Sequence, residues 1–372
     1  MLGERPMTKK APSIVFAGGG TAGHINPMLA IARAVRDLEP NAKILMLGTA
    51  DKMEAELVPA AGFDIEFIPR AAFPRSINRA ALAFPAKFFG GLSKTRRILK
   101  EADADVVVGV GGYVCPPAYL SALSAKIPVV IHEANAKPGL ANRLGGTFAE
   151  FTGVAFPNTP FPRATLVGMP MKDEIAYLNR EAHRSKARRN LGLDPQKPTV
   201  IVTGGSLGAL SLNNAVAACR DHFAEWDFQI LHITGKGKTV LDENGEPLSA
   251  PNYRQIEFSN GMQDVYAAAD LLLVRAGAAT VSEVAAVGVP AIFVPLPIGN
   301  GEQALNARSL VEASAALLVK DAEVTGEWFA REIPALMANP EELERMGAAA
   351  YELGIRDAAR VMAEAVLKAA EK

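Results

Sequence analysis

The sequence predicts an α/β fold with two similar domains in tandem, each built on a doubly wound parallel sheet. A β-branched run, a glycine-rich loop and a helical pattern follow one another at 12–29 and again at 198–218. Gly204 lies 186 positions after Gly18, half of the 372 residues, which indicates an internal repeat. Strand and helix patterns alternate through both halves, and the length exceeds what one hydrophobic core supports. The repeat alone also fits two unrelated α/β domains that each begin with a strand and a glycine turn.

The first strand leads into a glycine loop at 18–23, and Asn26 and Pro27 are expected to open the following helix as its N-cap and first residue. Glycines let the backbone approach a bulky anion, and a helix N-terminus offers unpaired N–H groups with a partial positive charge. The loop is therefore a candidate phosphate-binding site. A dinucleotide-binding fold would also need an acid at the end of the next strand, 43–47, which ends in Gly-Thr instead.

The rest of the first half alternates in the same way. Helices are expected at 27–38, 52–61 and from the Gly-Gly-Tyr loop to about 124, with strands at 43–47, 64–68, 105–110, 128–132 and 165–167. Ligands of such sheets lie at the carboxyl ends of the strands. The residues expected at those ends are His24, Gly111, Tyr113, Glu133 and Asn135.

The second half follows a turn at 168–170, where we expect the linker between the domains. Strands are expected at 199–203, 228–234, 254–258, 271–274 and 290–294, with helices at 174–189, 210–223, 323–337, 341–352 and 358–370. Thr280 and Glu283 fit a capping box, in which the glutamate returns to the start of its own helix. Alternatively, Glu283 faces the ligand crevice and accepts hydrogen bonds from both hydroxyls of a ribose.

Composition excludes several classes of partner and site. With 39 basic and 40 acidic residues the net charge is −1, so no nucleic-acid partner is expected. Cys115 and Cys219 are expected to be buried free thiols, and neither spacing suits a metal. The acidic pair at 103–105 precedes its strand, away from the ligand edge, so we expect a solvated turn and no metal site. Residues 1–11 are expected to form a disordered leader, because they lack the apolar segment of a signal peptide.

The segment 70–100 combines basic and aromatic residues without any acid. Its basic residues are Arg70, Arg75, Arg79, Lys87, Lys94, Arg96, Arg97 and Lys100, interleaved with Phe73, Phe84, Phe88 and Phe89. Such a pattern suits an anionic membrane surface, where cations meet headgroups and rings lie at the interface. It equally suits a solvated helix whose phenylalanines pack inward.

Six motifs, in order and across nearly the whole chain from Pro12, resemble the MurG family of undecaprenyldiphospho-muramoylpentapeptide β-N-acetylglucosaminyltransferases. They are GGGTAGH (18–24), GGYV (111–114), HEAN (132–135), GGSLGA (204–209), RAGAATVSE (275–283) and GEQALNA (301–307). The resemblance implies a GT-B fold, with two Rossmann-like domains and a cleft between them. An acceptor and membrane domain would span 12–168 and be joined by the C-terminal helix at 355–372, and a donor domain would span 169–354.

The activity implied is inverting transfer of N-acetylglucosamine from UDP-N-acetylglucosamine to the 4-hydroxyl of the muramoyl sugar of lipid I, giving lipid II, without a cofactor. The implied location is the cytoplasmic face of the cell membrane, as a peripheral protein bound through 70–100. Residues implied to contact the donor are Thr21, Ala22, Gly23, Asn135, Lys172, Ser206, Ser259, Ala278, Ala279, Thr280, Val281, Ser282, Glu283 and Gln303. Gly20, Tyr113 and Asn306 are expected elsewhere in the cleft.

The chain departs from the family pattern at a few of these positions. The family often has glycine where Ala22 stands, arginine where Lys172 stands, and glutamine where Leu207 and Glu302 stand. Arginine and lysine are not interchangeable in bidentate contacts, so the role of Lys172 is the least secure of those carried over.

Inverting displacement needs a base for the acceptor proton and a stabilised diphosphate leaving group. His24 is the expected base, because it alone among the five histidines follows a glycine loop, and Glu133 is the alternative. Other classes that fit parts of the pattern are a two-lobed sugar-binding protein and a dinucleotide oxidoreductase. Within the GT-B fold, the alternatives are a transferase for a soluble acceptor and a UDP-N-acetylglucosamine 2-epimerase.

Overall fold

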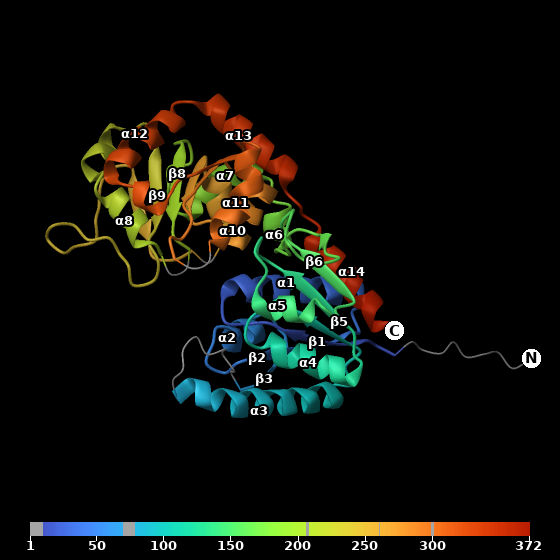
Figure 1. Cartoon of the computed structure of the whole chain (residues 1–372). Helices are drawn as coiled ribbons and strands as arrows, with labels where there is room; N and C mark the ends of the chain where they lie inside the picture. Colours follow the sequence, from blue (N-terminus) through green and yellow to red (C-terminus); the bar gives the residue numbers. More distant parts are fainter. Residues whose placement is uncertain (1–9, 70–78, 206–207, 260, 299–300) are drawn as a thin grey trace, which may run out of the picture. The chain divides into compact units, whose positions relative to one another are not determined.

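The computed structural model describes residues 10–69, 79–205, 208–259, 261–298 and 301–372 (Figure 1). The chain divides into two compact units. Unit 1 contains the chain up to Ala134, Pro138–Pro170 and Asp357–Lys372, and unit 2 contains Asn135–Lys137 and Met171–Arg356. Each unit has its own parallel sheet, which confirms the predicted fold class.

The sheet of unit 1 has seven strands within the described residues, in the order β3-β2-β1-β4-β5-β6-β7. The strands are β1 (Ser13–Ala17), β2 (Lys43–Gly48), β3 (Asp64–Phe67), β4 (Val106–Gly109), β5 (Val129–Glu133), β6 (Phe151–Val154) and β7 (Thr165–Leu166). All neighbouring pairs are parallel. The two central strands, β1 and β4, are entirely buried, as expected for apolar runs covered on both faces.

Helices cover both faces of this sheet. They are α1 (Ala22–Leu38), α2 (Glu54–Ala60), α3 (Arg79–Glu101), α4 (Cys115–Ala125), α5 (Leu140–Gly145) and α14 (Ala358–Ala370). Met362 and Val366 of α14 lie in one core cluster with Ile31 and Val35 of α1, so the last helix of the chain is part of unit 1. The other face is packed by α4, whose Tyr119 is fully buried.

The first helix begins earlier than predicted. Thr21, not Asn26, occupies the N-cap position, and Pro27 lies inside α1. The extended backbone of Thr21 places its carbonyl to accept hydrogen bonds from the N–H groups of His24 and Ile25, both at 3.1 Å. The helix therefore starts directly at the glycine loop, and the prediction that Asn26 and Pro27 open it is wrong.

The sheet of unit 2 has six strands within the described residues, in the order β10-β9-β8-β11-β12-β13 and all parallel. They are β8 (Thr199–Thr203), β9 (Gln229–Ile233), β10 (Tyr253–Ile256), β11 (Leu271–Val274), β12 (Ala291–Phe293) and β13 (Ala316–Leu318). The α-helices are α6 (Asp173–Ala176), α7 (Arg180–Asn190), α8 (Leu210–Ala217), α9 (Met262–Ala268), α10 (Ala278–Val287), α11 (Glu302–Glu312), α12 (Gly326–Met337) and α13 (Pro340–Leu353). Two 3₁₀ turns, η1 (Arg220–Glu225) and η2 (Asp321–Glu323), complete the unit.

Two predicted helices of the second half are interrupted. The helix expected at 174–189 is divided into α6 and α7, because Asn179 caps α7 by accepting a hydrogen bond from the Ala182 N–H at 3.1 Å. The helix expected at 210–223 ends at Ala217 and gives way to η1. Within the described ranges, no helix combines the length and apolar character needed to cross a bilayer.

Candidate active site

A buried carboxylate supports the first glycine loop. Glu54, which is 1% exposed, accepts a hydrogen bond from the Gly20 N–H at 2.9 Å through Oε2. Its Oε1 accepts from the Thr49 N–H at 3.0 Å and the Thr49 hydroxyl at 2.8 Å. A Cβ at Gly19 would lie 2.5 Å from Glu54 Oε1, so the loop needs glycine there. Glu54 was not predicted as a site residue, because the expected place for an acid was the end of β2, whereas the Glu54 carboxylate reaches the loop from α2.

His24 lies in the first turn of α1, beside this loop. Its Nδ1 is 3.3 Å from Thr21 Oγ1, and a Cβ at Gly111 would lie 3.0 Å from Nε2. The backbone of Gly111, with φ of +105°, therefore forms one wall of the histidine site. Burial lowers the pKa of His24, and the Glu133 carboxylate and a hydrogen bond with the Gly19 backbone partly oppose that shift.

Glu133 ends β5 and is held by donors of its own unit. Its Oε2 accepts hydrogen bonds from the Gly139 N–H and from Asn142 Nδ2, both at 3.0 Å. Asn142 in turn accepts from the Tyr119 hydroxyl at 2.8 Å and donates to the His132 carbonyl at 3.2 Å. The glutamate is thus a fixed, buried negative charge that favours protonation of His24.

The second predicted loop of unit 1 lies against the first. A Cβ at Gly112 would lie 2.7 Å from the Gly19 carbonyl oxygen, so the two loops make close backbone contact. Tyr113 follows with an exposed side chain. Unit 1 therefore brings together Gly20, Thr21, His24, Tyr113 and Glu133 at the carboxyl ends of its strands.

In unit 2, the glycine loop after β8 also requires glycine, because neighbouring backbone atoms leave no room for a Cβ. A Cβ at Gly204 would lie 2.1 Å from the Ala209 nitrogen, and Gly205 has a φ of +79°. Ser206, which was predicted to contact the donor, lies outside the described residues.

Glu283 lies on α10, which begins at Ala278 with Gly277 as its N-cap. Thr280 is therefore inside the helix, and the capping-box interpretation is wrong. Instead, the Tyr266 hydroxyl donates a hydrogen bond to Glu283 Oε2 at 2.6 Å. Burial raises the pKa of Glu283 to about 7, while Tyr266 and the charge of Lys172 act in the opposite direction.

The other predicted residues of unit 2 lie in α11, before α6 and after β10. Asn306 is buried, accepts a hydrogen bond from the Ala136 N–H at 2.9 Å and donates to the Ala276 carbonyl at 3.3 Å. It thereby ties the segment that carries Asn135 to the start of the loop before α10. Gln303 Oε1 accepts from the Leu296 N–H at 2.9 Å. Lys172 is exposed just before α6, and Ser259 is half-buried after β10.

Arg275, which was not predicted as a site residue, supports the loop between β11 and α10. Arg275 donates to Ser211 Oγ at 3.0 Å and to the Val294 carbonyl at 3.1 Å. It also pairs with Asp321 at 2.5 Å. The guanidinium thus joins the end of β11 to α8, β12 and η2. An arginine opening a glycine-containing loop directly after a strand was the available signal.

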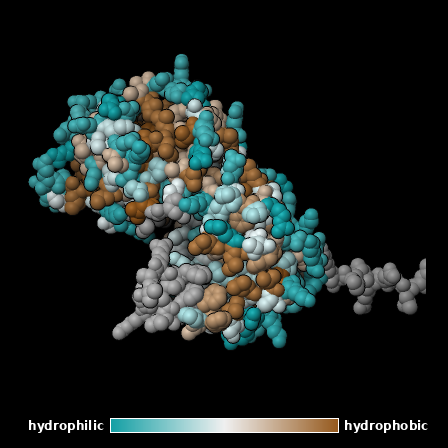
Figure 2. Space-filling view, viewed as in Figure 1, coloured by the Kyte–Doolittle hydropathy of each residue, from teal (hydrophilic) through white to brown (hydrophobic). Residues whose placement is uncertain are grey.

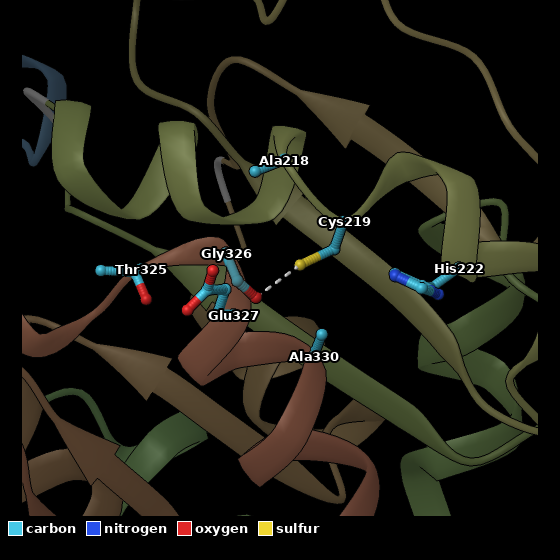
Figure 3. A pocket seen from close by; sticks show the side chains of 7 residues that line it. All are labelled: Ala218, Cys219, His222, Thr325, Gly326, Glu327 and Ala330. Carbon is cyan, nitrogen blue, oxygen red and sulfur yellow. Dashed lines mark hydrogen bonds between the residues drawn. The ribbon is translucent and has the colours of Figure 1, made fainter.

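A surface pocket of about 540 Å³ lies elsewhere in unit 2, between α8, η1 and α12 (Figure 3). Figure 3 shows Cys219 pointing to the Gly326 carbonyl, to which its thiol donates at 3.1 Å. Burial raises the pKa of Cys219 to about 11, so the thiol is unreactive. None of the predicted site residues lines this pocket. The described residues also contain no group of three or more His, Cys, Asp or Glu side chains arranged to hold a metal ion.

Comparison with known proteins gives consistent matches over both units. Residues 14–153 match the glycosyltransferase family 28 N-terminal domain, and residues 199–362 match the C-terminal domain of that family. A UDP-N-acetylglucosamine--N-acetylmuramyl-(pentapeptide) pyrophosphoryl-undecaprenol N-acetylglucosamine transferase of Paenarthrobacter aurescens is 53% identical over 97% of both chains. The protein of the same name from Clavibacter sepedonicus is 47% identical over 95% of both.

Solved structures with the same fold match this chain over nearly its full length. The crystal structure of Acinetobacter baumannii MurG has a TM-score of 0.76 at 29% identity, covering 96% of this chain and 99% of that one. A glycosyltransferase of kitacinnamycin has a TM-score of 0.72 at 18% identity, covering 97% of this chain and 99% of that one, which supports the fold alone. The GT-B fold predicted for the chain is thereby confirmed.

Proposed function

Because the chain belongs to glycosyltransferase family 28, we propose that it transfers N-acetylglucosamine from UDP-N-acetylglucosamine to N-acetylmuramyl-(pentapeptide) pyrophosphoryl-undecaprenol, that is, from the donor to lipid I, giving lipid II. The observation that carries this proposal is the 53% identity, over nearly the full length, to a relative named for this reaction.

The donor nucleotide binds to unit 2 in this proposal. Glu283 accepts hydrogen bonds from the ribose hydroxyls, and the start of α10, at 278–280, offers backbone N–H groups and a partial positive charge to the diphosphate. Val281 and Ser282 are further contacts proposed from the family resemblance. Gln303, Ser259, Asn135 and Lys172 are the further donor contacts proposed from the family resemblance. The roles of Thr21, Ala22 and Gly23 in donor binding are proposed on the same basis.

His24 is the proposed general base. Its lowered pKa keeps the imidazole neutral at pH 7, as a base must be. The ring nitrogen takes the proton of the 4-hydroxyl as the oxygen bonds to the anomeric carbon from the face opposite the UDP, and the bond from that carbon to the diphosphate breaks. Glu133 is better suited to stabilise the resulting imidazolium, because two donors already fix its Oε2.

We also propose that unit 1 contacts an anionic membrane surface through α3 and its neighbours. Figure 2 shows hydrophobic side chains exposed over α3, α4 and α5. Phe89 is 65% exposed on α3, with Leu123, Leu140 and Leu144 exposed on α4 and α5. The exposed cations Lys87, Arg96 and Lys100 accompany them on α3. Residues 70–78 of the predicted membrane segment lie outside the described residues.

The test is transfer from UDP-N-acetylglucosamine to a short-chain lipid I analogue by the purified full chain, with product linkage determined by NMR. We expect a β-linked disaccharide product and stoichiometric release of UDP. Transfer to soluble acceptors only, or conversion of the donor to its 2-epimer without transfer, would refute the proposal in favour of another GT-B activity.

A further inference from the structure

We propose that Tyr266 is a positioning residue for nucleotide recognition, which holds the Glu283 carboxylate from inside the core and presents it to the ribose of a uridine diphosphate. This inference rests on the proposed function, which assigns the donor nucleotide to unit 2. It extends that function by one residue: Tyr266 does not touch the nucleotide, but its hydroxyl sets the orientation and the charge of the Glu283 carboxylate, which does.

The geometry of the pair supports this role. Tyr266, on α9, is 1% exposed, whereas Glu283, on α10, is only half-buried. The 2.6 Å hydrogen bond therefore reaches the carboxylate from the core side, and the exposed part of Glu283 faces solvent. An ionised carboxylate has about four acceptor positions, so a bond from one tyrosine leaves capacity for both hydroxyls of a ribose.

A role in core stability alone does not explain why the Tyr266 hydroxyl bonds a glutamate. A buried tyrosine hydroxyl needs a partner, but a backbone carbonyl of the core would satisfy it without desolvating an acid. Here the partner is a glutamate at the carboxyl edge of the sheet of unit 2, and hydrogen bonds to charged groups are roughly twice as strong as neutral ones. The hydrogen bond from Tyr266 therefore fixes the orientation of Glu283, the side chain proposed to bind the two hydroxyls of the ribose.

The pair also sets the pH at which the site is charged. Burial raises the pKa of Glu283 to about 7, and the groups that act against burial are the Tyr266 hydroxyl of α9 and Lys172 next to α6. Among the described residues, no charged group of α11 or α13, which also pack on α10, adds to the shift. Only the ionised carboxylate accepts from both hydroxyls, so UDP affinity should rise with pH through the Glu283 pKa. Removal of the tyrosine hydroxyl removes a donor to the ionised form, which should move that midpoint to higher pH.

The experiment measures the affinity of the full chain for UDP by calorimetry between pH 5.5 and 9, for the wild type, Tyr266→Phe, Glu283→Gln and Tyr253→Phe. Tyr253→Phe is the matched control, because it removes a hydroxyl that bonds His232 Nδ1 at 3.0 Å in the same unit. We expect Tyr266→Phe to weaken UDP binding about tenfold at pH 7 and to raise the midpoint. Glu283→Gln should remove the pH dependence near the Glu283 pKa and leave only that of the UDP terminal phosphate, whose second pKa is about 6. Tyr253→Phe should change neither the affinity nor the midpoint. Melting temperatures of the variants check that each is folded.

A second ligand separates positioning from loss of packing. The wild type should bind UDP more tightly than 2′-deoxy-UDP, and Tyr266→Phe should reduce that discrimination. If Tyr266→Phe keeps the wild-type midpoint and discrimination, the inference is wrong while the proposed function stands. If the wild type binds UDP at no pH, the proposed function itself fails.

Discussion

At the scale of single residues, Glu54 limits which backbone donors of the first glycine loop can bind a ligand. Its carboxylate already accepts a hydrogen bond from the Gly20 N–H, so this N–H group is not available to a ligand. The loop therefore acts first as a support that places His24 at the start of α1. An anion bound in unit 1 would therefore need donors other than the Gly20 N–H.

Glu54→Gln is expected to destabilise unit 1 and to lower kcat. A glutamine amide places an NH₂ group against either the Gly20 or the Thr49 N–H, which leaves a buried donor unpaired at about 1–3 kcal/mol. Chemical denaturation followed by circular dichroism measures the loss of stability. Glu56→Gln is the control, because Glu56 is exposed on the same helix. Equal effects of the two substitutions would show that Glu54 has no special supporting role.

His24→Ala is expected to lower kcat by about 10² to 10⁴ while the affinity for UDP stays nearly unchanged. A base matters only when the acceptor hydroxyl attacks, so the loss should fall on turnover. Because burial lowers the pKa of His24 in the free protein below its ordinary 6.5, the acidic limb of the wild-type kcat/KM profile should lie below that pH and disappear in the variant. The measurement is the pH profile of kcat/KM, together with kcat at pH 7.

Two results would contradict the assignment of His24. Weaker UDP binding with an unchanged profile would make the histidine a phosphate ligand. Retention of kcat within about threefold would transfer the role of base to Glu133, and the profile of Glu133→Gln would then decide.

The sequence predicted which residues lie at strand ends but not how they are held. His24 and Glu133 could be predicted because glycine loops and strand ends are local patterns. The contacts of Glu54 with Gly20 and of Glu283 with Tyr266 could not, because they join residues far apart in the sequence. The capping-box pattern at Thr280 was misleading because the helix starts three residues earlier than it implies, with the extended Gly277 as its N-cap.

At the scale of elements, the strands were predicted better than the helix ends. Buried parallel strands are short apolar runs, and the expected ranges 199–203 and 271–274 match β8 and β11 to the residue. The short strands β6 and β13 were not predicted. Helix starts depend on capping geometry. Thr21 caps α1 where Asn26 was expected to, and Asn179 begins a new helix inside the range 174–189, where one continuous helix was expected.

Charge reversal on α3 tests whether this helix contacts a membrane. Each cation close to an anionic surface contributes about 1 kcal/mol to binding. Lys87→Glu with Arg96→Glu should therefore reduce binding to vesicles that contain anionic lipid and remove most of its salt dependence. Sedimentation with vesicles measures the bound fraction. The control is Lys186→Glu with Arg189→Glu, two exposed basic positions on α7 of unit 2. Equal losses in both variants, or equal wild-type binding to neutral vesicles, would exclude α3 as the contact.

At the scale of the whole molecule, unit 1 is not continuous in sequence. Its core is completed by α14, which follows the last residue of unit 2 in the chain and packs on α1. This helix also contacts β4 and β5, which lie far from it in the sequence, so periodicity alone predicts a helix but not its location. Its return to the first domain was expected from the family resemblance.

Met362→Ala tests the contribution of α14 to unit 1. Met362 is fully buried against the core of that unit, and removal of a buried methionine side chain costs about 2–5 kcal/mol. Both tryptophans of the chain, Trp226 and Trp328, belong to unit 2, so their fluorescence monitors unit 2 while circular dichroism monitors both units. We expect the variant to acquire an early transition by circular dichroism while the midpoint seen by fluorescence stays in place. Lys368→Ala, at an exposed position of the same helix, should change neither. A fluorescence midpoint that falls together with the dichroism would mean that the two units unfold as one cooperative block.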